Sequence, residues 1–154
     1  MHPLVLCGDV TVSELATIGD LKAVSFPQFR DTRGVLVPLE LAKWIPFKIA
    51  RFFWVFNVPT GQMRGAHAHK LCNQYLICAF GLVHVDVHDG FSERTIALAA
   101  GQALHVPPGL FTAERYETSN SILMVFCDRP YEPEDYLNDR DTFLTYRRSK
   151  NQQR

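Results

Sequence analysis

Residues 61–81 read GQMRGAHAHKLCNQYLICAFG, a stretch that joins two closely spaced histidines to an apolar run. One residue separates His67 from His69, so a β-strand would place both side chains on the same face. Arg64 and Gly65 come just before them. Such a pair could ligate a metal, transfer protons or be ordinary surface residues, and the rest of the chain bears on the choice.

The chain around this stretch has the pattern of an all-β protein. From about Phe26 to Asp128, short apolar segments alternate with turn residues, and helical periodicity is weak. Turns are predicted where glycine can adopt positive φ or proline fixes φ, at DTRG (31–34), PTGQ (59–62), HDGF (88–91) and PPGL (107–110). The predicted strands are VLVPLEL (35–41), ARFFWVFNV (50–58), GAHAHK (65–70), NQYLICAF (73–80), LVHVDVHD (82–89), RTIALAA (94–100), QALHVPP (102–108), FTAERYE (111–117) and SILMVFC (121–127).

The two ends of the chain differ from this β-rich part. The segment EPEDYLNDRDTFLTYRR (132–148) places apolar side chains among charges, which predicts one or two short helices packed on the outside. We expect residues 1–22 to form an N-terminal lead-in whose role the sequence does not indicate. Residues 23–146 then form one domain with a C-terminal helical segment, and residues 147–154 form a flexible tail.

Composition narrows the classes of partner. Sixteen Lys and Arg balance sixteen Asp and Glu, so the formal net charge is zero, which argues against nucleic acid or an anionic membrane as the main partner. The four cysteines show no C-x-x-C spacing, which favours reduced thiols. The N-terminus MHPLVLCGDV lacks a basic region followed by a sustained apolar one, and no segment approaches the roughly 18 apolar residues of a membrane span. We expect a cytoplasmic protein.

The glycine, proline and histidine spacings resemble the two motifs of the cupins, which are small β-barrels. The first motif is matched by Gly61, His67, His69, Gln74 and Gly81, and the second begins with Gly101, Pro107 and Gly109. The resemblance implies an all-β cupin fold, a jelly-roll β-barrel, with both histidines facing its interior.

A metal site is disfavoured by the residues that follow the histidines. Metal-binding cupins use three histidines and one glutamate, but here Gln74 occupies the glutamate position, Thr112 the third histidine position and Tyr116 the asparagine position of the second motif. Two imidazoles alone are a poor site for a divalent ion. We therefore expect no metal and no other cofactor, and we interpret the histidines as proton-transfer groups, since imidazole titrates near neutral pH.

A narrower resemblance is carried by Arg64, Gly65, His67, Ala68, His69, Lys70, Gln74, Leu76 and Cys78, and it extends from about Ser25 to Tyr146. It includes the blocks DTRGVLVPLE, IPFKIARFFWVFN and DRPYEPEDYLNDRDTF. The chain thus resembles the metal-free, WxcM-like cupins of deoxysugar nucleotide biosynthesis, which are 3,4-ketoisomerases acting on dTDP-4-keto-6-deoxyglucose. The resemblance implies a dTDP-linked keto sugar as ligand and a homodimer formed through N-terminal strands.

That family resemblance also implies roles for particular side chains. His67 matches the base that removes the C3 proton, and His69 matches its partner in proton transfer. Arg64 would bind the developing enediolate or the diphosphate, because a guanidinium suits either. Arg51 matches an arginine that faces the nucleotide, although it could instead close the barrel rim. The remaining candidates for substrate binding are Phe53, Gln74, Phe111 and Thr112.

Two departures from the family keep an alternative open. Phe53 stands where the family has tyrosine, and Phe111-Thr112 stands where it often has Trp-His. Both changes remove polar groups from the expected pocket. The alternative to an isomerase is therefore a divergent cupin that binds a nucleotide sugar without efficient turnover, and a metal-dependent cupin oxygenase is a third, disfavoured reading.

Overall fold

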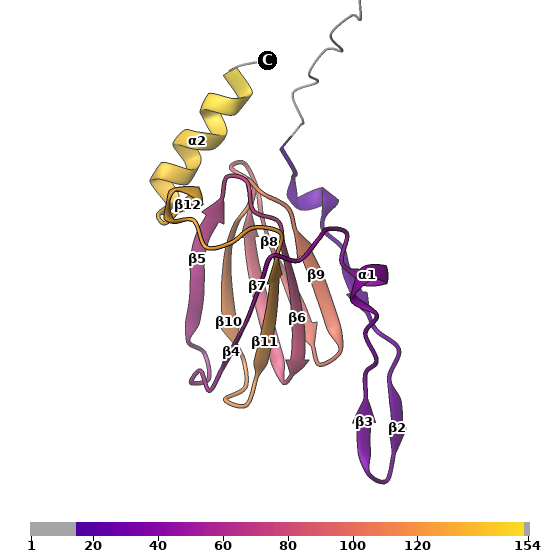
Figure 1. The fold of residues 1–154 in the computed structure, drawn as a ribbon. Coiled ribbons are helices and arrows are strands. Elements are labelled where there is room, and N and C mark those ends of the chain that lie inside the picture. Colours follow the sequence, from indigo (N-terminus) through magenta and orange to yellow (C-terminus); the bar gives the residue numbers. More distant parts are fainter. Residues whose placement is uncertain (1–14, 153–154) are drawn as a thin grey trace, which may run out of the picture.

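The computed structural model describes residues 15–152, which form two five-stranded sheets, a projecting hairpin and a C-terminal helix (Figure 1). The first sheet has the order β1 (Ala23–Ser25), β9 (Gln102–Val106), β6 (Gln74–Phe80), β11 (Ile122–Cys127) and β4 (Arg51–Phe56). The second has the order β12 (Tyr136–Leu137), β5 (Met63–His69), β10 (Phe111–Tyr116), β7 (Leu82–His88) and β8 (Glu93–Ala99). The predicted all-β class and the jelly-roll arrangement are confirmed, although the sheets stay separate and do not close into one barrel.

Alternating apolar side chains fill the space between the sheets. In β7, Val83, Val85 and Val87 are almost completely buried, whereas the residues between them are only partly buried. Leu123 and Val125 of β11 contribute in the same way from the first sheet. This period of two is what a strand with one buried face requires. Each predicted strand between residues 50 and 127 overlaps an observed strand.

One predicted strand is wrong over most of its length. The segment 35–41 was expected to be extended, but β3 (Gly34–Leu36) stops before Pro38, and the short helix α1 (Leu41–Trp44) follows. Proline has no amide hydrogen to donate to a ladder, which explains the early end. In the described chain, β3 pairs only with β2 (Phe29–Asp31), and this hairpin projects away from the sheets (Figure 1).

The C-terminal segment packs on the outside, as predicted, through a turn of 3-10 helix, η2 (Pro133–Asp135), and the helix α2 (Arg140–Gln152). Phe143 of α2 is fully buried against the outer face of the second sheet. The helix extends beyond the boundary that we placed at residue 147, because Arg147 is buried and its Nη1 donates to the carbonyl oxygens of Ala16 (3.0 Å) and Gly109 (3.1 Å).

Of the predicted lead-in, residues 1–14 lie outside the described range, and residues 15–22 include the 3-10 turn η1 (Ile18–Asp20). Within residues 15–152, no helix has both the length and the apolar character that a membrane span needs.

Candidate functional site

A cavity of about 150 Å³ lies between the two sheets and has two unlike walls. The second sheet supplies what we call the polar wall, which consists of Arg64, Gly65 and His67 of β5 and Glu114 and Tyr116 of β10. The first sheet supplies what we call the apolar wall, which consists of Phe53, Val55, Gln74, Leu76, Leu123 and Val125. Its single polar side chain is the amide of Gln74. The structure therefore brings four of the predicted site residues, Arg64, His67, Phe53 and Gln74, to one cavity.

A β-bulge in β5 places Arg64 on the polar wall. In the pairing with β10, His67 lies opposite Thr112 and Arg64 lies opposite Glu114. The two residues of β5 are three positions apart in sequence but their partners in β10 are only two apart, so β5 carries one extra residue. The two intervening residues of β5 have positive φ, 79° and 55°. Strict alternation would have turned Arg64 to the outer face, and a bulge is a known means of redirecting a side chain.

His67 presents an available imidazole nitrogen in this cavity. Its Nε2 is buried and has no hydrogen-bond partner among residues 15–152. Burial lowers the pKa of His67 below its ordinary value, and the nearby charge of Arg51 lowers it further. The ring is therefore neutral at physiological pH and can accept a proton, as a general base must.

His69 lies behind His67 and is held by an acid from the C-terminal segment. The two imidazole rings meet edge to face with 5.0 Å between centroids. His69 Nδ1 donates to Asp135 Oδ2 at 2.7 Å, and both side chains are buried. Asp135 is itself fixed by the backbone amides of Leu71 (2.7 Å) and Cys72 (3.3 Å).

This pairing sets the properties of the His69 ring. With its proton on Nδ1, a neutral His69 keeps Nε2 as an acceptor, and that nitrogen has no partner in the described chain. Burial lowers the pKa of His69, although the hydrogen bond with Asp135 opposes the change. A proton placed on His69 would therefore be released readily.

Arg51 lies beside the cavity, at the end marked by Phe53. Its guanidinium carbon is 5.6 Å from the ring centroids of both Phe53 and Tyr131. Its Nη2 donates to Tyr136 Oη (3.3 Å) and approaches Cys127 Sγ (3.5 Å). Because its Nε remains buried without a partner within residues 15–152, the guanidinium retains a free donor.

Gln74 and Thr112 occupy buried positions with few polar partners. Gln74 Nε2 approaches Cys127 Sγ at 3.9 Å, which is a weak contact for an amide donor. Thr112 Oγ1 donates to Glu114 Oε1 at 3.0 Å. Thr112 thus supports a member of the polar wall, although it does not itself line the cavity.

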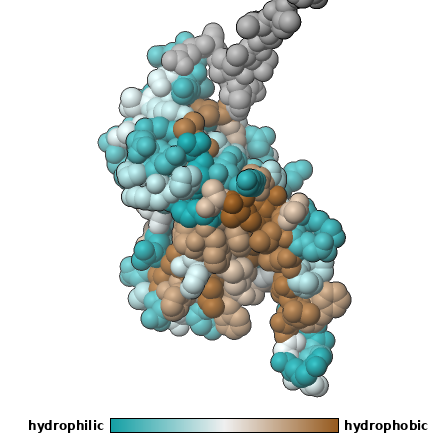
Figure 2. Space-filling view, viewed as in Figure 1, coloured by the Kyte–Doolittle hydropathy of each residue, from teal (hydrophilic) through white to brown (hydrophobic). Residues whose placement is uncertain are grey.

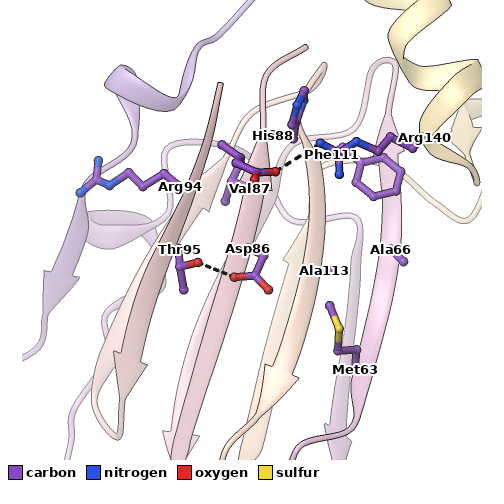
Figure 3. Close-up of a pocket in the computed structure, with 11 residues that line it drawn as sticks. Met63, Ala66, Asp86, Val87, His88, Arg94, Thr95, Phe111, Ala113 and Arg140 are labelled. Carbon is purple, nitrogen blue, oxygen red and sulfur yellow. Dashed lines mark hydrogen bonds and ion pairs between the residues drawn. The ribbon is translucent and has the colours of Figure 1, made fainter. Parts of the chain in front are cut away.

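Arg51, His69 and Thr112 lie next to the cavity without lining it, whereas Phe111 lies on the opposite face of its sheet. Alternation along β10 turns it to the outer face of the second sheet, where its ring packs 5.4 Å from that of Phe143 in α2. Figure 3 shows it with Met63 and Ala66 in a separate groove on this outer face. Neighbouring residues of a strand point to opposite faces, so Phe111 and Thr112 cannot both border one cavity.

Sequence reasoning did not assign three polar residues of this region to the site, although it placed one of them, Tyr116, at a cupin motif position. Glu114 and Tyr116 could have been found, since they lie two and four residues beyond Thr112 and so share its face. Asp135 left no such signal, because it is 66 residues from His69 in a segment predicted only to be helical. The Tyr116 hydroxyl is buried, and no partner for it exists between residues 15 and 152.

Three potential metal ligands come together, of which only His69 is a predicted site residue. One ligand atom each from His69, Cys72 and Asp135 lies within 4.8 Å of the others. However, the Asp135 oxygens already accept hydrogen bonds from the other two residues. The hydrogen bond with Cys127, together with burial, raises the pKa of the Cys72 thiol and so disfavours the thiolate that would bind a metal. The group is better explained as the network that orients His69.

Comparison with known proteins gives one consistent result. The chain matches the protein family described as FdtA, WxcM-like, C-terminal, over residues 19–148. A relative, the TDP-4-oxo-6-deoxy-alpha-D-glucose-3,4-oxoisomerase of Aneurinibacillus thermoaerophilus, is 33% identical over 126 residues, which cover 81% of this chain and 91% of the relative.

Solved structures agree with the sequence match. A 3,4-ketoisomerase from Helicobacter canadensis shares 31% identity at a TM-score of 0.76, covering 84% of this chain and 98% of that one. A sugar 3,4-ketoisomerase from Thermoanaerobacterium thermosaccharolyticum, crystallised with TDP, shares 26% identity at a TM-score of 0.78, covering 87% and 98%. Sequence and fold therefore indicate the same group of proteins.

Proposed function

Because the chain belongs to the FdtA, WxcM-like family, we propose that it is a 3,4-ketoisomerase that converts a TDP-linked 4-keto-6-deoxyhexose to its 3-keto isomer. The observation that carries this proposal is the pair of histidines on β5. His67 presents a free Nε2 in a cavity, and His69 behind it is held by Asp135. The proposal is supported by relatives whose names specify this chemistry.

The reaction requires a proton to leave C3 and a proton to reach C4 through an enediol. We assign the first transfer to His67, because its lowered pKa keeps the ring neutral. His69 assists delivery at C4, since burial weakens its hold on a proton. Arg64 stabilises the developing enediolate or the diphosphate, because it lines the cavity from the redirected position in β5.

The cavity is large enough for only one part of the substrate. Pockets for drug-sized ligands span roughly 300–1,000 Å³, so about 150 Å³ accommodates the sugar ring and leaves the nucleotide outside. Phe53 and Gln74 then contact the sugar, and Thr112 acts through Glu114. We assign the contact with the nucleotide to Arg51, because its guanidinium carbon lies 5.6 Å from the ring of Phe53, which lines the cavity.

We further propose that the protein is a homodimer. Phe52, Trp54 and Phe56 on the outer face of β4 are each at least 44% exposed. The hairpin adds the exposed apolar residues Phe29, Val35 and Leu36. Figure 2 shows apolar surface over the sheet and the upper part of the hairpin. Apolar surface of this kind marks an interaction site, and a second copy would cover it.

We propose that the enzyme acts without a metal and in the cytoplasm. Gln74 offers only an amide where a carboxylate ligand would stand, and the described cysteines are free thiols. Elemental analysis should find no stoichiometric transition metal, and chelation should leave activity unchanged. One equivalent of iron, zinc or nickel whose removal abolishes activity would favour the oxygenase reading instead.

The proposed reaction is tested directly with TDP-4-keto-6-deoxyglucose in deuterated water, followed by NMR and mass spectrometry. We expect the 3-keto product and incorporation of solvent deuterium. If the protein binds TDP or the sugar nucleotide but neither exchanges hydrogen nor forms product, it is the divergent binding protein and the isomerase assignment is wrong.

A further inference from the structure

Glu114 is a buried carboxyl in the polar wall that the two-histidine scheme does not use. Its side chain is 8% exposed and lies on the cavity-facing side of β10. Thr112 Oγ1 donates to Oε1 at 3.0 Å, and no ion pair to Glu114 occurs within residues 15–152. Burying a carboxylate without a cation costs folding free energy, so a role in the cavity would explain why a carboxyl occupies this position.

The bulge in β5 makes room for this carboxyl. A Cβ added at Gly65 would lie 2.1 Å from Glu114 Oε2, so the carboxyl fills the space that the missing side chain leaves. It therefore sits between the positions of Arg64 and His67, the two residues of β5 whose side chains line the cavity. Among residues 15–152, the only other residue that donates a hydrogen bond to this carboxyl is Thr112, and that bond goes to Oε1.

Its surroundings favour the protonated acid. Burial raises the pKa of Glu114 to about 7, although the hydrogen bond from Thr112 lowers it in part. Burial, and then the charge of Glu114, raise the pKa of the neighbouring Tyr116 phenol, which therefore stays protonated. The groups that face Glu114 are Arg64 and His67 from β5, Tyr116 from its own strand, Val85 from β7, and Gln74 with apolar side chains from the first sheet.

The two histidines do not account for the proton that the isomerisation moves between the C3 and C4 oxygens. Moving a carbonyl from C4 to C3 requires the C3 oxygen to lose a proton and the C4 oxygen to gain one. The histidines are assigned to the hydrogens on carbon. Phe53, on the opposite wall, has no group that can exchange a proton, and the alcohol of Thr112 does not line the cavity. The raised pKa of the Tyr116 phenol disfavours loss of its proton.

We propose that Glu114 carries the oxygen-bound proton, giving one to the C4 oxygen and taking one from the C3 oxygen; this inference rests on the proposed isomerase function. Because Oε1 accepts the hydrogen bond from Thr112, Oε2 is the oxygen that exchanges the proton. It donates to the C4 oxygen first and, once deprotonated, accepts from the adjacent C3 oxygen.

The two half-reactions balance without any further reagent. As His67 removes the C3 proton, the C–H electron pair forms the C3–C4 double bond, and the C4 oxygen takes the proton of Glu114. His67 then passes its proton to Nε2 of His69, which delivers it to C4, while the C3 oxygen returns a proton to the Glu114 carboxylate and the C3 carbonyl forms. C3 is oxidised, C4 is reduced, and Glu114 ends in its starting state.

The decisive comparison is Glu114→Gln against Glu117→Gln. Both remove a carboxylate from the same region of the chain, but Glu117 lies outside the cavity and pairs with Arg115. We expect Glu114→Gln to lower kcat by about 10²- to 10⁴-fold, as for other general acid and base groups, while the Kd for TDP changes by no more than about threefold. Glu117→Gln should retain the wild-type kcat.

The pH profile separates a proton carrier from a structural residue. Glu114 must start protonated and His67 neutral, so wild-type kcat/KM should fall on the basic side near pH 7 and on the acidic side below pH 6.5. Glu114→Gln should lose the basic limb. Thr112→Val removes the donor to the carboxyl, so it should move that limb to higher pH.

The outcomes separate a failure of the Glu114 role from a failure of the proposed isomerase function. An inactive wild type would show that the proposed isomerase function is wrong, and the role of Glu114 would fall with it. An active wild type with unchanged kcat and an unchanged basic limb in Glu114→Gln would overturn the role of Glu114 alone. If Glu114→Gln does not fold, as judged by circular dichroism, an unshifted basic limb in Thr112→Val overturns it equally.

Discussion

His67 and His69 share a strand face but differ in what surrounds them, and the proposed division of their roles rests on that difference. His69 is anchored through Nδ1 to a buried aspartate, whereas the Nε2 of His67 is buried in the cavity without a partner within residues 15–152. An anchored ring suits the delivery of a proton to a fixed point, and a free neutral nitrogen suits its removal.

The corresponding prediction compares His67→Asn with His69→Asn. His67→Asn should lower kcat by about 10²- to 10⁴-fold with TDP affinity within an order of magnitude. His69→Asn should still exchange the C3 hydrogen with deuterated solvent while forming little 3-keto product. NMR of the substrate in deuterated water measures both quantities.

His84→Asn is the matched control, because His84 lies on β7 and pairs with Glu117 away from the cavity. It should behave like the wild type. Normal turnover in His67→Asn would contradict the assignment of the base, and equal loss of C3 exchange in both variants would contradict the division of roles.

Glu114 should also reveal its burial through protein stability. At pH values below 4.5, the ordinary pKa of a glutamate, Glu114 is protonated in both the folded and the unfolded state. Between pH 4.5 and about pH 7 it is protonated only in the folded state, and above about pH 7 it is ionised in both. The free energy of unfolding therefore falls as pH rises through this window. Relative to the wild type, Glu114→Gln should gain stability from pH 4 to pH 8, by as much as about 3 kcal/mol at 1.36 kcal/mol per pKa unit.

Urea unfolding at a series of pH values measures this difference. The Glu117→Gln control should show no such gain, since the hydrogen bond from Arg115 lowers the pKa of Glu117. A constant difference between Glu114→Gln and the wild type at all pH values would mean that the carboxyl is not buried as the structure has it.

At the scale of elements, the bulge in β5 determines which side chains reach the cavity. Periodicity predicted β5 and the shared face of its histidines, because that information is local to the strand. It could not predict that Arg64 also faces inward, since the extra residue appears only when β5 pairs with β10, whose partner for Arg64 is Glu114. For the same reason Asp135, which reaches His69 from 66 residues away, was not found.

Gly65→Ala tests the bulge, with Gly61→Ala as its matched control. Both glycines have φ near 80°, but a Cβ at Gly61 would meet no atom within 4 Å, whereas one at Gly65 would meet the Glu114 carboxyl. Gly61→Ala should cost about 1–2 kcal/mol, the cost of a left-handed conformation for a residue with a Cβ. Gly65→Ala should cost more and should lower kcat.

Adding Glu114→Ala to Gly65→Ala isolates the contact. The second substitution removes the atoms that the new Cβ would meet, so the excess cost of Gly65→Ala over Gly61→Ala should disappear in chemical unfolding. Equal costs for the two single variants would show that the carboxyl does not occupy the space over Gly65.

At the scale of the whole molecule, the exposed apolar residues are concentrated on β4 and the hairpin. One face of β4 points to the cavity through Phe53, while Trp54 and Phe56 on the other face are 57% and 59% exposed. If one face of β4 lines the cavity and the other packs against a second copy of the chain, dimerisation would affect the geometry of the cavity.

Light scattering at micromolar concentration should therefore give twice the mass of the chain, and Trp54→Glu combined with Phe56→Glu should give the single mass. Phe91→Glu is the control, because Phe91 is even more exposed, at 69%, but lies in the turn between β7 and β8. A monomeric wild type would remove the prediction, and a dimer in the β4 variant would place the interface elsewhere.

The two unlike walls of the cavity have a stereochemical consequence. The groups proposed to transfer protons, His67, His69 and Glu114, all come from strands of the second sheet, whereas the first sheet presents hydrocarbon and one amide. A sugar ring lying between the walls exchanges protons only through the face turned toward β5 and β10. The isomerisation is then suprafacial: hydrogen leaves C3 and arrives at C4 on the same side of the ring, and the configuration of the new alcohol follows from which sheet the ring faces.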